Sequence, residues 1–384
     1  MIKALHRVAI GAVLTCCILM PATAAGDGAI VTAASSTQFD STMLLAIVFG
    51  FAFGLLLAIA RVNRNSVIAG MATLEDFRVA KTMAAAIGVG AVLLAFLVVT
   101  GAASYHVKPL ILGGVVYGGL LFGTGMAILG YCPGTLPISL GQGALDAGVG
   151  ILGGLLGGLT FTAAKPALVP ILGKDLGPQS LYLGMEPFPI AYLLVCSVFG
   201  IVLVGLAFLM HRREKAHGYL WLYAGAGLGL LNAIMILPAT VGRLIGASTS
   251  FPFLADRLVG FTESDYYQQI AEPGNWEVWF LFGAFLAGLA YSLARKEFRW
   301  QFVSSHWQRY KGTNPGKRAF WAFIGGFILL FGARVAGGCT SGHILSGMMQ
   351  LASSAFVFAV LVFIAFLLTG KLFYRGTKLR STGR

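Results

Sequence analysis

The stretch "RVAGGCTSGHILSGMMQ", from Arg334 to Gln350, interrupts an apolar part of the chain with glycines, small hydroxyl side chains and one cysteine. A second stretch, "AILGYCPGTLPISLGQG" from Ala127 to Gly143, has the same character. Aligning the two cysteines brings further residues into register at a constant shift of 207 positions. The matched pairs are Gly118/Gly325, Gly119/Gly326, Gly125/Gly332, Gly130/Gly337, Cys132/Cys339 and Ser139/Ser346. This spacing indicates an internal repeat.

A second match supports the repeat. "GFAFGLLLAI", Gly50 to Ile59, resembles "GAGLGLLNAI", Gly225 to Ile234. Together the matches predict four membrane spans, one linking span and four more. Because a unit of four spans plus one linker reverses the second copy, the halves are expected to be inverted-topology repeats with the substrate site between them. The alternative is that glycine- and leucine-rich sequence produced both matches by chance.

Composition defines the class of protein. The chain has 384 residues, 57% hydrophobic and 11% charged, and a mean hydropathy of +0.83. Several segments of about 20 apolar residues can each cross a bilayer as a helix. A transmembrane β-barrel would show short alternating segments instead. The sequence therefore predicts an all-α polytopic membrane protein, and its 52 glycines predict close helix contacts or broken helices.

We expect about nine transmembrane helices plus short re-entrant half-helices. The predicted spans are 42–60, 82–101, 110–130, 147–164, 188–210, 219–238, 276–294, 319–338 and 355–373. The predicted organisation is a signal peptide (1–25), a first membrane repeat (42–187), a linking helix (188–210), a second, inverted repeat (219–373) and a basic tail (374–384).

The N-terminus has the pattern of a signal peptide. Lys3 and Arg7 precede a short apolar run, and Ala22-Thr23-Ala24 provides a cleavage site with small residues. The alternative is a first helix that is retained.

Charge sets the expected orientation. The formal net charge is +13, and the basic residues gather in loops after the first, fifth and seventh spans and in the tail. Since cytoplasmic loops carry the excess of Lys and Arg, we expect a protein of the bacterial inner membrane with its mature N-terminus periplasmic and its C-terminus cytoplasmic. The sequence contains no basic patch interleaved with aromatic residues, so nucleic acid is not expected as a partner.

The two cysteine stretches are the candidate site. The apolar runs after Cys132 and Cys339 are too short to cross a membrane, so they predict half-helices whose free N–H groups and dipole favour an anion. A thiol is soft and polarizable, which suits a substrate with an exposed sulfur. The predicted substrate-binding or relay residues are Gly130, Cys132, Pro133, Gly134, Thr135, Arg334, Gly337, Gly338, Cys339, Thr340, Ser341, Gly342 and His343.

Several of these residues have alternative interpretations. Membrane cysteines are commonly small packing residues, as we expect for Cys196. Arg334 could attract an anion or pair structurally, and His343 could carry a proton or be a satisfied interface histidine. Thr340 or Ser341 could cap a helix start. Asp146 is expected to be a capping or solvated residue.

"GYCPGT" and "AGGCTSGH" resemble the YeeE/YedE-type sulfur transport family. The resemblance implies uptake of thiosulfate or a related sulfur anion across the bacterial inner membrane, with no enzymatic activity. It also implies an inverted repeat pinched at the membrane centre, where Cys132 and Cys339 act as relay thiols. Family members can carry a further cysteine after the first span, but Arg61 to Gly70 contains none.

No cofactor or metal is expected. A cytoplasmic sulfur-carrier or sulfurtransferase, if one takes part, would be a separate protein, because no such domain is fused to the chain. Two other functions remain open. One is a thiol redox sensor that uses both cysteines, and the other is a soft-metal transporter, which would normally gather more soft ligands.

Overall fold

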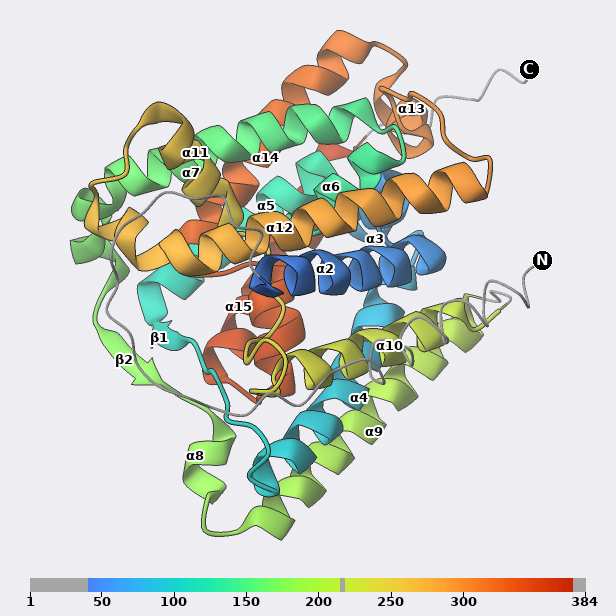
Figure 1. Cartoon of the computed structure of the whole chain (residues 1–384). Coiled ribbons are helices and arrows are strands. Elements are labelled where there is room, and N and C mark those ends of the chain that lie inside the picture. The colour runs from blue at the N-terminus through green and yellow to red at the C-terminus, as the bar shows by residue number, and fades with distance from the viewer. Residues whose placement is uncertain (1–40, 215–217, 376–384) are drawn as a thin grey trace. The chain divides into compact units, whose positions relative to one another are not determined.

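The computed structural model describes residues 41–214 and 218–375, and these form helices joined by short connections (Figure 1). The elements are α2 (Ser41–Ala60), α3 (Asn65–Ala72), α4 (Arg78–Val99), β1 (Pro109–Ile111), α5 (Leu112–Leu129), α6 (Thr135–Gly141), α7 (Leu145–Leu172), β2 (Asp175–Pro178), α8 (Leu181–Met185), α9 (Pro189–Arg213), α10 (Leu220–Met235), α11 (Ser250–Val259), α12 (Asp265–Ala294), α13 (Ser305–Lys311), α14 (Pro315–Val335), η1 (Thr340–Gly347) and α15 (Ser353–Phe373). The predicted signal peptide lies outside the described residues, as does most of the predicted tail.

The prediction of an all-α polytopic membrane protein is confirmed. Within the described residues, eight helices are long and apolar enough to cross a membrane: α2, α4, α5, α7, α9, α12, α14 and α15. Their limits agree with the predicted spans except at α7 and α12, which extend further through internal prolines. The remaining predicted span, 219–238, corresponds to α10, whose 16 residues rise about 24 Å, somewhat less than the ~30 Å of a hydrocarbon core.

Helices α5 and α14 cross through paired glycines. A Cβ atom built on Gly118 would lie 2.7 Å from the Gly332 carbonyl oxygen, and one built on Gly125 would lie 2.9 Å from that of Gly325. The order of these contacts shows that the two helices run antiparallel. Because Gly118 and Gly125 are the predicted repeat partners of Gly325 and Gly332, each contact maps onto the other when the halves are exchanged. A two-fold axis through the crossing would produce this relation.

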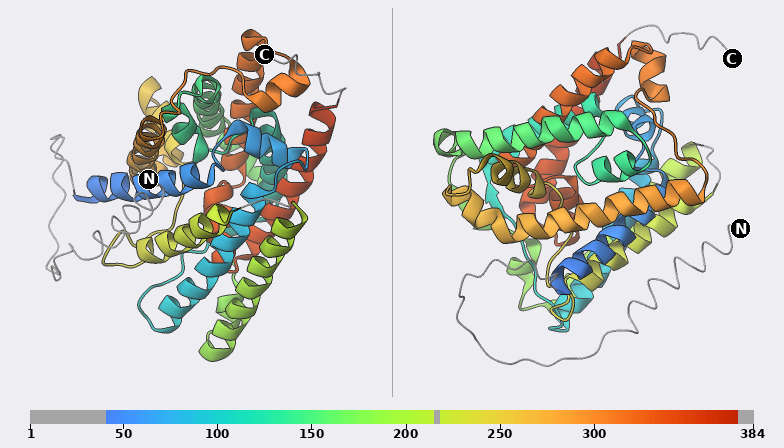
Figure 2. Two further views of the ribbon diagram at one scale, coloured as in Figure 1. Left: turned by 90° about the vertical axis from the view of Figure 1, so that its right-hand side faces the viewer. Right: turned by 45° about the horizontal axis from the view of Figure 1, so that its top comes forward.

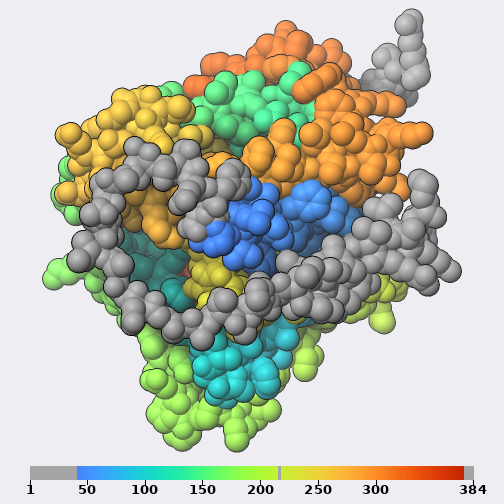
Figure 3. All heavy atoms as spheres, in the orientation of Figure 1, coloured from blue at the N-terminus to red at the C-terminus, as the bar shows by residue number. Residues whose placement is uncertain are grey.

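Exchanging the two predicted repeats also maps the neighbouring helix pairs onto one another. α2 packs on α12 and α10 on α4, while α7 packs on α14 and α15 on α5. Figures 2 and 3 show α2 lying along α12. Gly50 meets Phe280 and Gly54 meets Ala284, so α2 and α12 run parallel. Successive spans cross the membrane in opposite directions. α2 and α12 can therefore be parallel only if α10 also counts as a span. The packing therefore supports the inverted repeat, whose exact limits stay a prediction.

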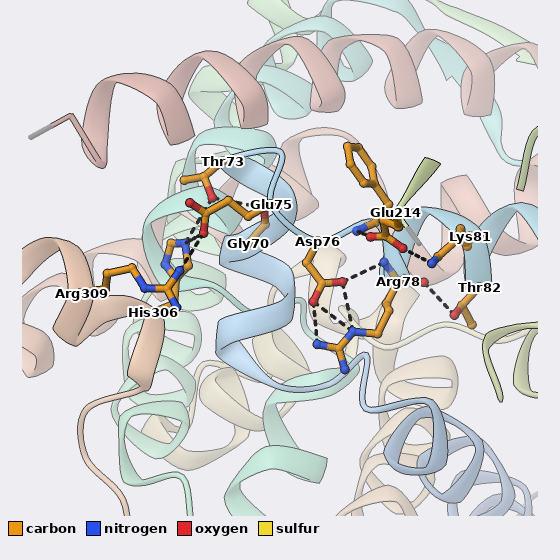
Figure 4. A network of polar contacts seen from close by, with 11 residues as sticks. Gly70, Thr73, Glu75, Asp76, Arg78, Lys81, Thr82, Glu214, His306 and Arg309 are labelled. Carbon is orange, nitrogen blue, oxygen red and sulfur yellow. Dashed lines mark hydrogen bonds and ion pairs between the residues drawn. The ribbon is translucent and has the colours of Figure 1, made fainter. Parts of the chain in front are cut away.

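The predicted linking helix, α9, packs chiefly against α4. Its last turn leads to Glu214, whose carboxylate accepts the Phe77 backbone N–H at 2.6 Å and pairs with the buried Lys81 ammonium group (Figure 4). Nearby, Glu75 pairs with Arg309 of α13 at 3.2 Å. These contacts fix the α3–α4 turn to elements far away in sequence.

Candidate functional site

The first helix break begins where α5 ends. Gly130 has a φ of +74°, the left-handed conformation that glycine adopts at helix ends, and its N–H bonds to the Met126 carbonyl at 2.8 Å. The backbone N–H of Cys132 donates to the Thr135 hydroxyl at 2.9 Å. The seven-residue helix α6 then follows, with its side chains mostly buried. The short helix expected after Cys132 is therefore present.

The second break repeats this geometry. Gly337 also has a φ of +74°, and the N–H of Gly338 bonds to the Ala333 carbonyl at 2.8 Å. The short π-helix η1 starts directly after Cys339, whose side chain is 1% exposed. The equal conformation of Gly130 and Gly337 explains why the sequence places glycine at both positions.

Neither helix start has a side-chain cap. No side chain caps α6, which begins at Thr135, or η1, which begins at Thr340. The prediction that Thr340 or Ser341 caps η1 is wrong, because the Ser341 hydroxyl lies 3.1 Å from the Cys339 sulfur instead. Pro133 lies two residues before the start of α6.

The two breaks meet inside the protein. The Cys132 thiol lies near the hydroxyl groups of Thr135 and Thr340 and near the Cys339 thiol. A Cβ atom on Gly134 would lie 3.3 Å from the ring of Phe53. Cys132 is half-buried, and both cysteines are free thiols. The fold therefore brings both predicted thiols into one closely packed region.

Two polar cavities approach the breaks. The inner cavity, of about 370 Å³, is lined by residues that include Arg64, Tyr131, Ser139, Lys296, Glu297 and Arg299. The outer cavity, of about 490 Å³, is lined by residues that include Lys108, Arg243, Glu272, Glu277, His343 and Ser346. The inner one is reached from the loops that follow α2 and α12, the outer one from the loops that follow α4 and α10. Ser139 and Ser346, one in each cavity, are predicted repeat partners.

A buried ion pair holds the first break. Arg318 is fully buried, donates to the Asp146 carboxylate at 2.9 Å and also donates to the Leu129 carbonyl at 2.7 Å. The Tyr131 hydroxyl donates to the same carboxylate at 3.0 Å. Asp146 is thus a buried ion-pair partner, and the expectation of a capping or solvated residue is wrong. The sequence did contain a signal for this pair, since Arg318 adjoins an apolar span and charges at membrane depth are usually paired.

Arg334 has a different environment. It is 8% exposed and donates to the hydroxyl groups of Tyr266 at 2.7 Å, Ser248 at 3.2 Å and Thr249 at 3.3 Å. No carboxylate within residues 41–214 and 218–375 forms an ion pair with it. The positive charge of Arg334 is therefore buried among neutral partners.

One residue of η1 and one residue beside it line the outer cavity. His343, in η1, is 2% exposed, and its ring packs against that of Phe358. Lys108, which sequence analysis missed, donates to the Gly337 carbonyl at 2.8 Å. A Cβ atom on either Gly338 or Gly342 would meet its ammonium nitrogen, at 3.0 Å in the case of Gly342. A lysine in a loop gives no sequence signal for this placement.

The remaining chemistry-bearing residues are outside this region. Cys196 is buried among the residues between α4 and α9, as expected for a packing residue. In the part of the chain that the structure describes, no group of three or more His, Cys, Asp or Glu side chains could hold a metal ion.

Comparison with known proteins identifies related chains. A family model described as sulphur transport matches residues 59–368. The thiosulfate transporter TsuA of Spirochaeta thermophila is 27% identical over 330 residues, which cover 81% of this chain and 93% of that protein.

Proposed function

This chain belongs to the sulphur transport family, and we propose that it is a permease that takes up thiosulfate or a related sulfur-containing anion. Its helices make it a multi-pass membrane protein, and its family consists of transporters rather than enzymes. The observation that carries the proposal is the meeting of the Cys132 and Cys339 breaks between two cavities reached from opposite ends of the helices. In this proposal the path runs from the outer cavity through both thiols to the inner cavity.

The thiols suit a substrate with a terminal sulfur atom. A protonated thiol is a weak donor and a polarizable contact, so it can hold sulfur without binding it tightly. Weak binding at successive sites lets an ion move on. The proposed order is Cys339 first and Cys132 second, and no covalent bond to either cysteine is required.

A two-thiol relay is proposed because the segment after α2 carries asparagines instead of a further cysteine. Asn63 donates to Ser139 at 3.2 Å and to Gln142 at 2.9 Å, both near the inner cavity. Asn65 donates to the Leu129 carbonyl at 2.9 Å. This segment therefore supports the first break through amide hydrogen bonds. The related thiosulfate transporter makes thiosulfate the first substrate to test.

The proposed orientation follows the basic residues. Arg64, Lys296 and Arg299 line the inner cavity, which we assign to the cytoplasm because cytoplasmic loops are rich in Lys and Arg. This places the C-terminus in the cytoplasm and the mature N-terminus in the periplasm, in a bacterial inner membrane. A separate cytoplasmic sulfur-carrier or sulfurtransferase would receive the substrate from the inner cavity.

Uptake of radiolabelled thiosulfate tests the relay. In cells that depend on thiosulfate, Cys132→Ala and Cys339→Ala should each reduce uptake at least tenfold, because each removes a sulfur contact from the path. Cys196→Ala is the matched control, since that thiol lies away from both breaks, and it should retain uptake. Near-normal uptake by both relay variants at equal membrane abundance would refute the proposal.

The closeness of the two free thiols also favours a second candidate, a redox sensor. Thiol titration of the protein before and after mild oxidant separates the two functions. A sensor would form a Cys132–Cys339 disulfide rapidly, whereas a permease should keep both thiols reduced during uptake.

A further inference from the structure

The loops at the end of the helices that carries the inner cavity hold positive charge without matching negative charge. Each carboxylate described at this end has a basic partner: Glu75 pairs with Arg309, Asp76 with Arg78, Asp146 with Arg318, Glu214 with Lys81 and Glu297 with Arg64. Lys311 and Lys317 form no ion pair within residues 41–214 and 218–375. No carboxylate described at this end therefore neutralises these two lysines.

The two lysines lie close to each other. Lys311 is the last residue of α13, and Lys317 lies in the first turn of α14. Partial burial and the charge of Lys317 lower the pKa of Lys311, which agrees with two ammonium groups that repel each other. A helix start carries partial positive charge and disfavours a cation, so the place of Lys317 is unfavourable as well. An anion between the two ammonium groups would relieve both effects.

Aromatic side chains surround the lysines. The Lys311 ammonium nitrogen lies 4.3 Å from the centroid of the Phe373 ring, at the end of α15, and that centroid lies 4.9 Å from the centroid of the Trp321 ring. Trp321 follows Lys317 by one turn of α14, and its neighbour Phe320 is 59% exposed. Aromatic residues concentrate at the membrane–water interface, where their rings lie at the level of the lipid headgroups. The two lysines therefore lie at headgroup level.

The exposed face of α15 supports this level. Ile364 and Leu368 are exposed, and Lys371 and Arg375 continue the same face at helical spacing. The face thus changes from apolar to basic at the end of the helix, as a surface does where acyl chains give way to headgroups. An acidic protein in water would meet the basic groups but would leave the exposed ring of Phe320 without an apolar partner. A phospholipid has both parts.

We propose that Lys311 and Lys317 bind the phosphate of an anionic phospholipid such as phosphatidylglycerol, with Phe320 against its acyl chains. Basic residues beside a membrane span attract anionic lipids, and each ammonium group offers three donors to phosphate oxygens. Phosphatidylcholine carries a cation that cancels its phosphate charge, so the site should discriminate against it. The inference adds a lipid ligand to the protein and does not depend on which anion is transported.

Native mass spectrometry of the purified, delipidated full-length protein tests the site. In the presence of excess phosphatidylcholine, the wild-type protein should bind phosphatidylglycerol preferentially. Lys311→Ala and Lys317→Ala should each weaken this binding about fivefold, and the double variant about 25-fold. Replacement of either lysine by arginine should retain most of the affinity. Arg213→Ala, which removes an exposed charge at the same end of the helices, is the matched control and should change nothing.

Three results would overturn the lipid site. One is unchanged phosphatidylglycerol binding by the double variant, eluting as wild type in gel filtration, and another is equal binding of both lipids by the wild-type protein. The third is displacement of phosphatidylglycerol by inorganic phosphate or by a polyglutamate peptide, which have no acyl chains. Displacement by phosphate would indicate a site for a free anion, and displacement by the peptide would indicate a surface for an acidic protein.

Discussion

At the first break Arg318 pairs with Asp146 and completes the carbonyl end of α5, whereas at the second break Arg334 is surrounded by neutral hydroxyl groups such as that of Tyr266. The backbone of the two breaks is nevertheless alike, with a left-handed glycine before each cysteine. The difference indicates that the repeat preserves the backbone while its halves carry different charge. The first break is neutralised internally by an ion pair, whereas the buried positive charge at the second break has hydroxyl partners only.

The largest expected loss of stability comes from removing the buried ion pair at the first break. Arg318→Leu would leave Asp146 buried without its partner, which costs about 3–5 kcal/mol for a buried pair. The double variant Arg318→Leu/Asp146→Leu should regain much of this stability. Arg334→Leu should cost less, because it leaves only hydroxyl groups unpaired. Unfolding of the purified protein in detergent measures all three, and equal losses for Arg318→Leu and Arg334→Leu would contradict the comparison.

The glycine crossing tests whether the halves are equivalent in packing. Gly125→Val and Gly332→Val should each destabilise the protein by about 1–3 kcal/mol through overpacking, since each added Cβ would enter the facing backbone. The two losses should be similar if a two-fold axis relates the positions. Gly205→Val is the control, because nothing lies within 4 Å of its Cβ position. Tolerance of one substitution but not the other would argue against equivalence.

A second buried carboxylate sharpens the contrast with Asp146. Asp256 of α11 accepts the Thr162 hydroxyl at 2.8 Å, its other carboxylate oxygen has no partner, and burial raises its pKa to about 6. Because the folded state binds this proton more tightly than the unfolded chain, whose Asp pKa is about 3.9, stability should fall as pH rises from about 4 to about 6.

Asp256→Asn should therefore raise the free energy of unfolding at pH 8 by roughly 1–3 kcal/mol and should give no gain at pH 4. Unfolding followed at both pH values in detergent measures this. A destabilised variant at pH 8 would show that the carboxylate is compensated by a contact other than Thr162.

The smallest expected effect is at Tyr131. Tyr131→Phe removes one hydrogen bond to Asp146, which keeps its pairing with Arg318, so the loss should be about 1 kcal/mol. Tyr117→Phe, at an exposed position of α5, should be neutral in the same unfolding assay. A loss as large as that of Arg318→Leu would mean that Tyr131 and not the ion pair holds the first break.

The elements that could be predicted from sequence depend on local pattern. Apolar length determines the spans, so the limits of α2 and α15 were predicted to within a few residues. The short helices after Cys132 and Cys339 followed from the same rule, because their apolar runs cannot cross a bilayer. The spacing of Gly118 and Gly125 from Gly325 and Gly332 indicated a repeat, and the structure adds that these glycines contact one another.

The remaining features depend on contacts between distant parts of the chain. Arg318 reaches Asp146 across 172 positions and Lys108 reaches Gly337 across 229, so no local pattern connects them. The helices α3, α11 and α13 have 8, 10 and 7 residues, which is too short to cross a membrane, so counting spans did not find them. The wrong prediction of a cap at η1 assumed that a hydroxyl near a helix start serves the backbone, whereas that of Ser341 contacts a thiol.

The placement of the two cavities has an electrical consequence. If water fills both cavities, it carries the potential of each side inward, and most of the membrane voltage should then fall across the partition that contains the thiols. A dianion moving between Cys339 and Cys132 would then do nearly all its electrical work in that one short step, about 2.3 kcal/mol per charge for each 100 mV. Uptake should consequently depend on voltage most strongly at that transfer.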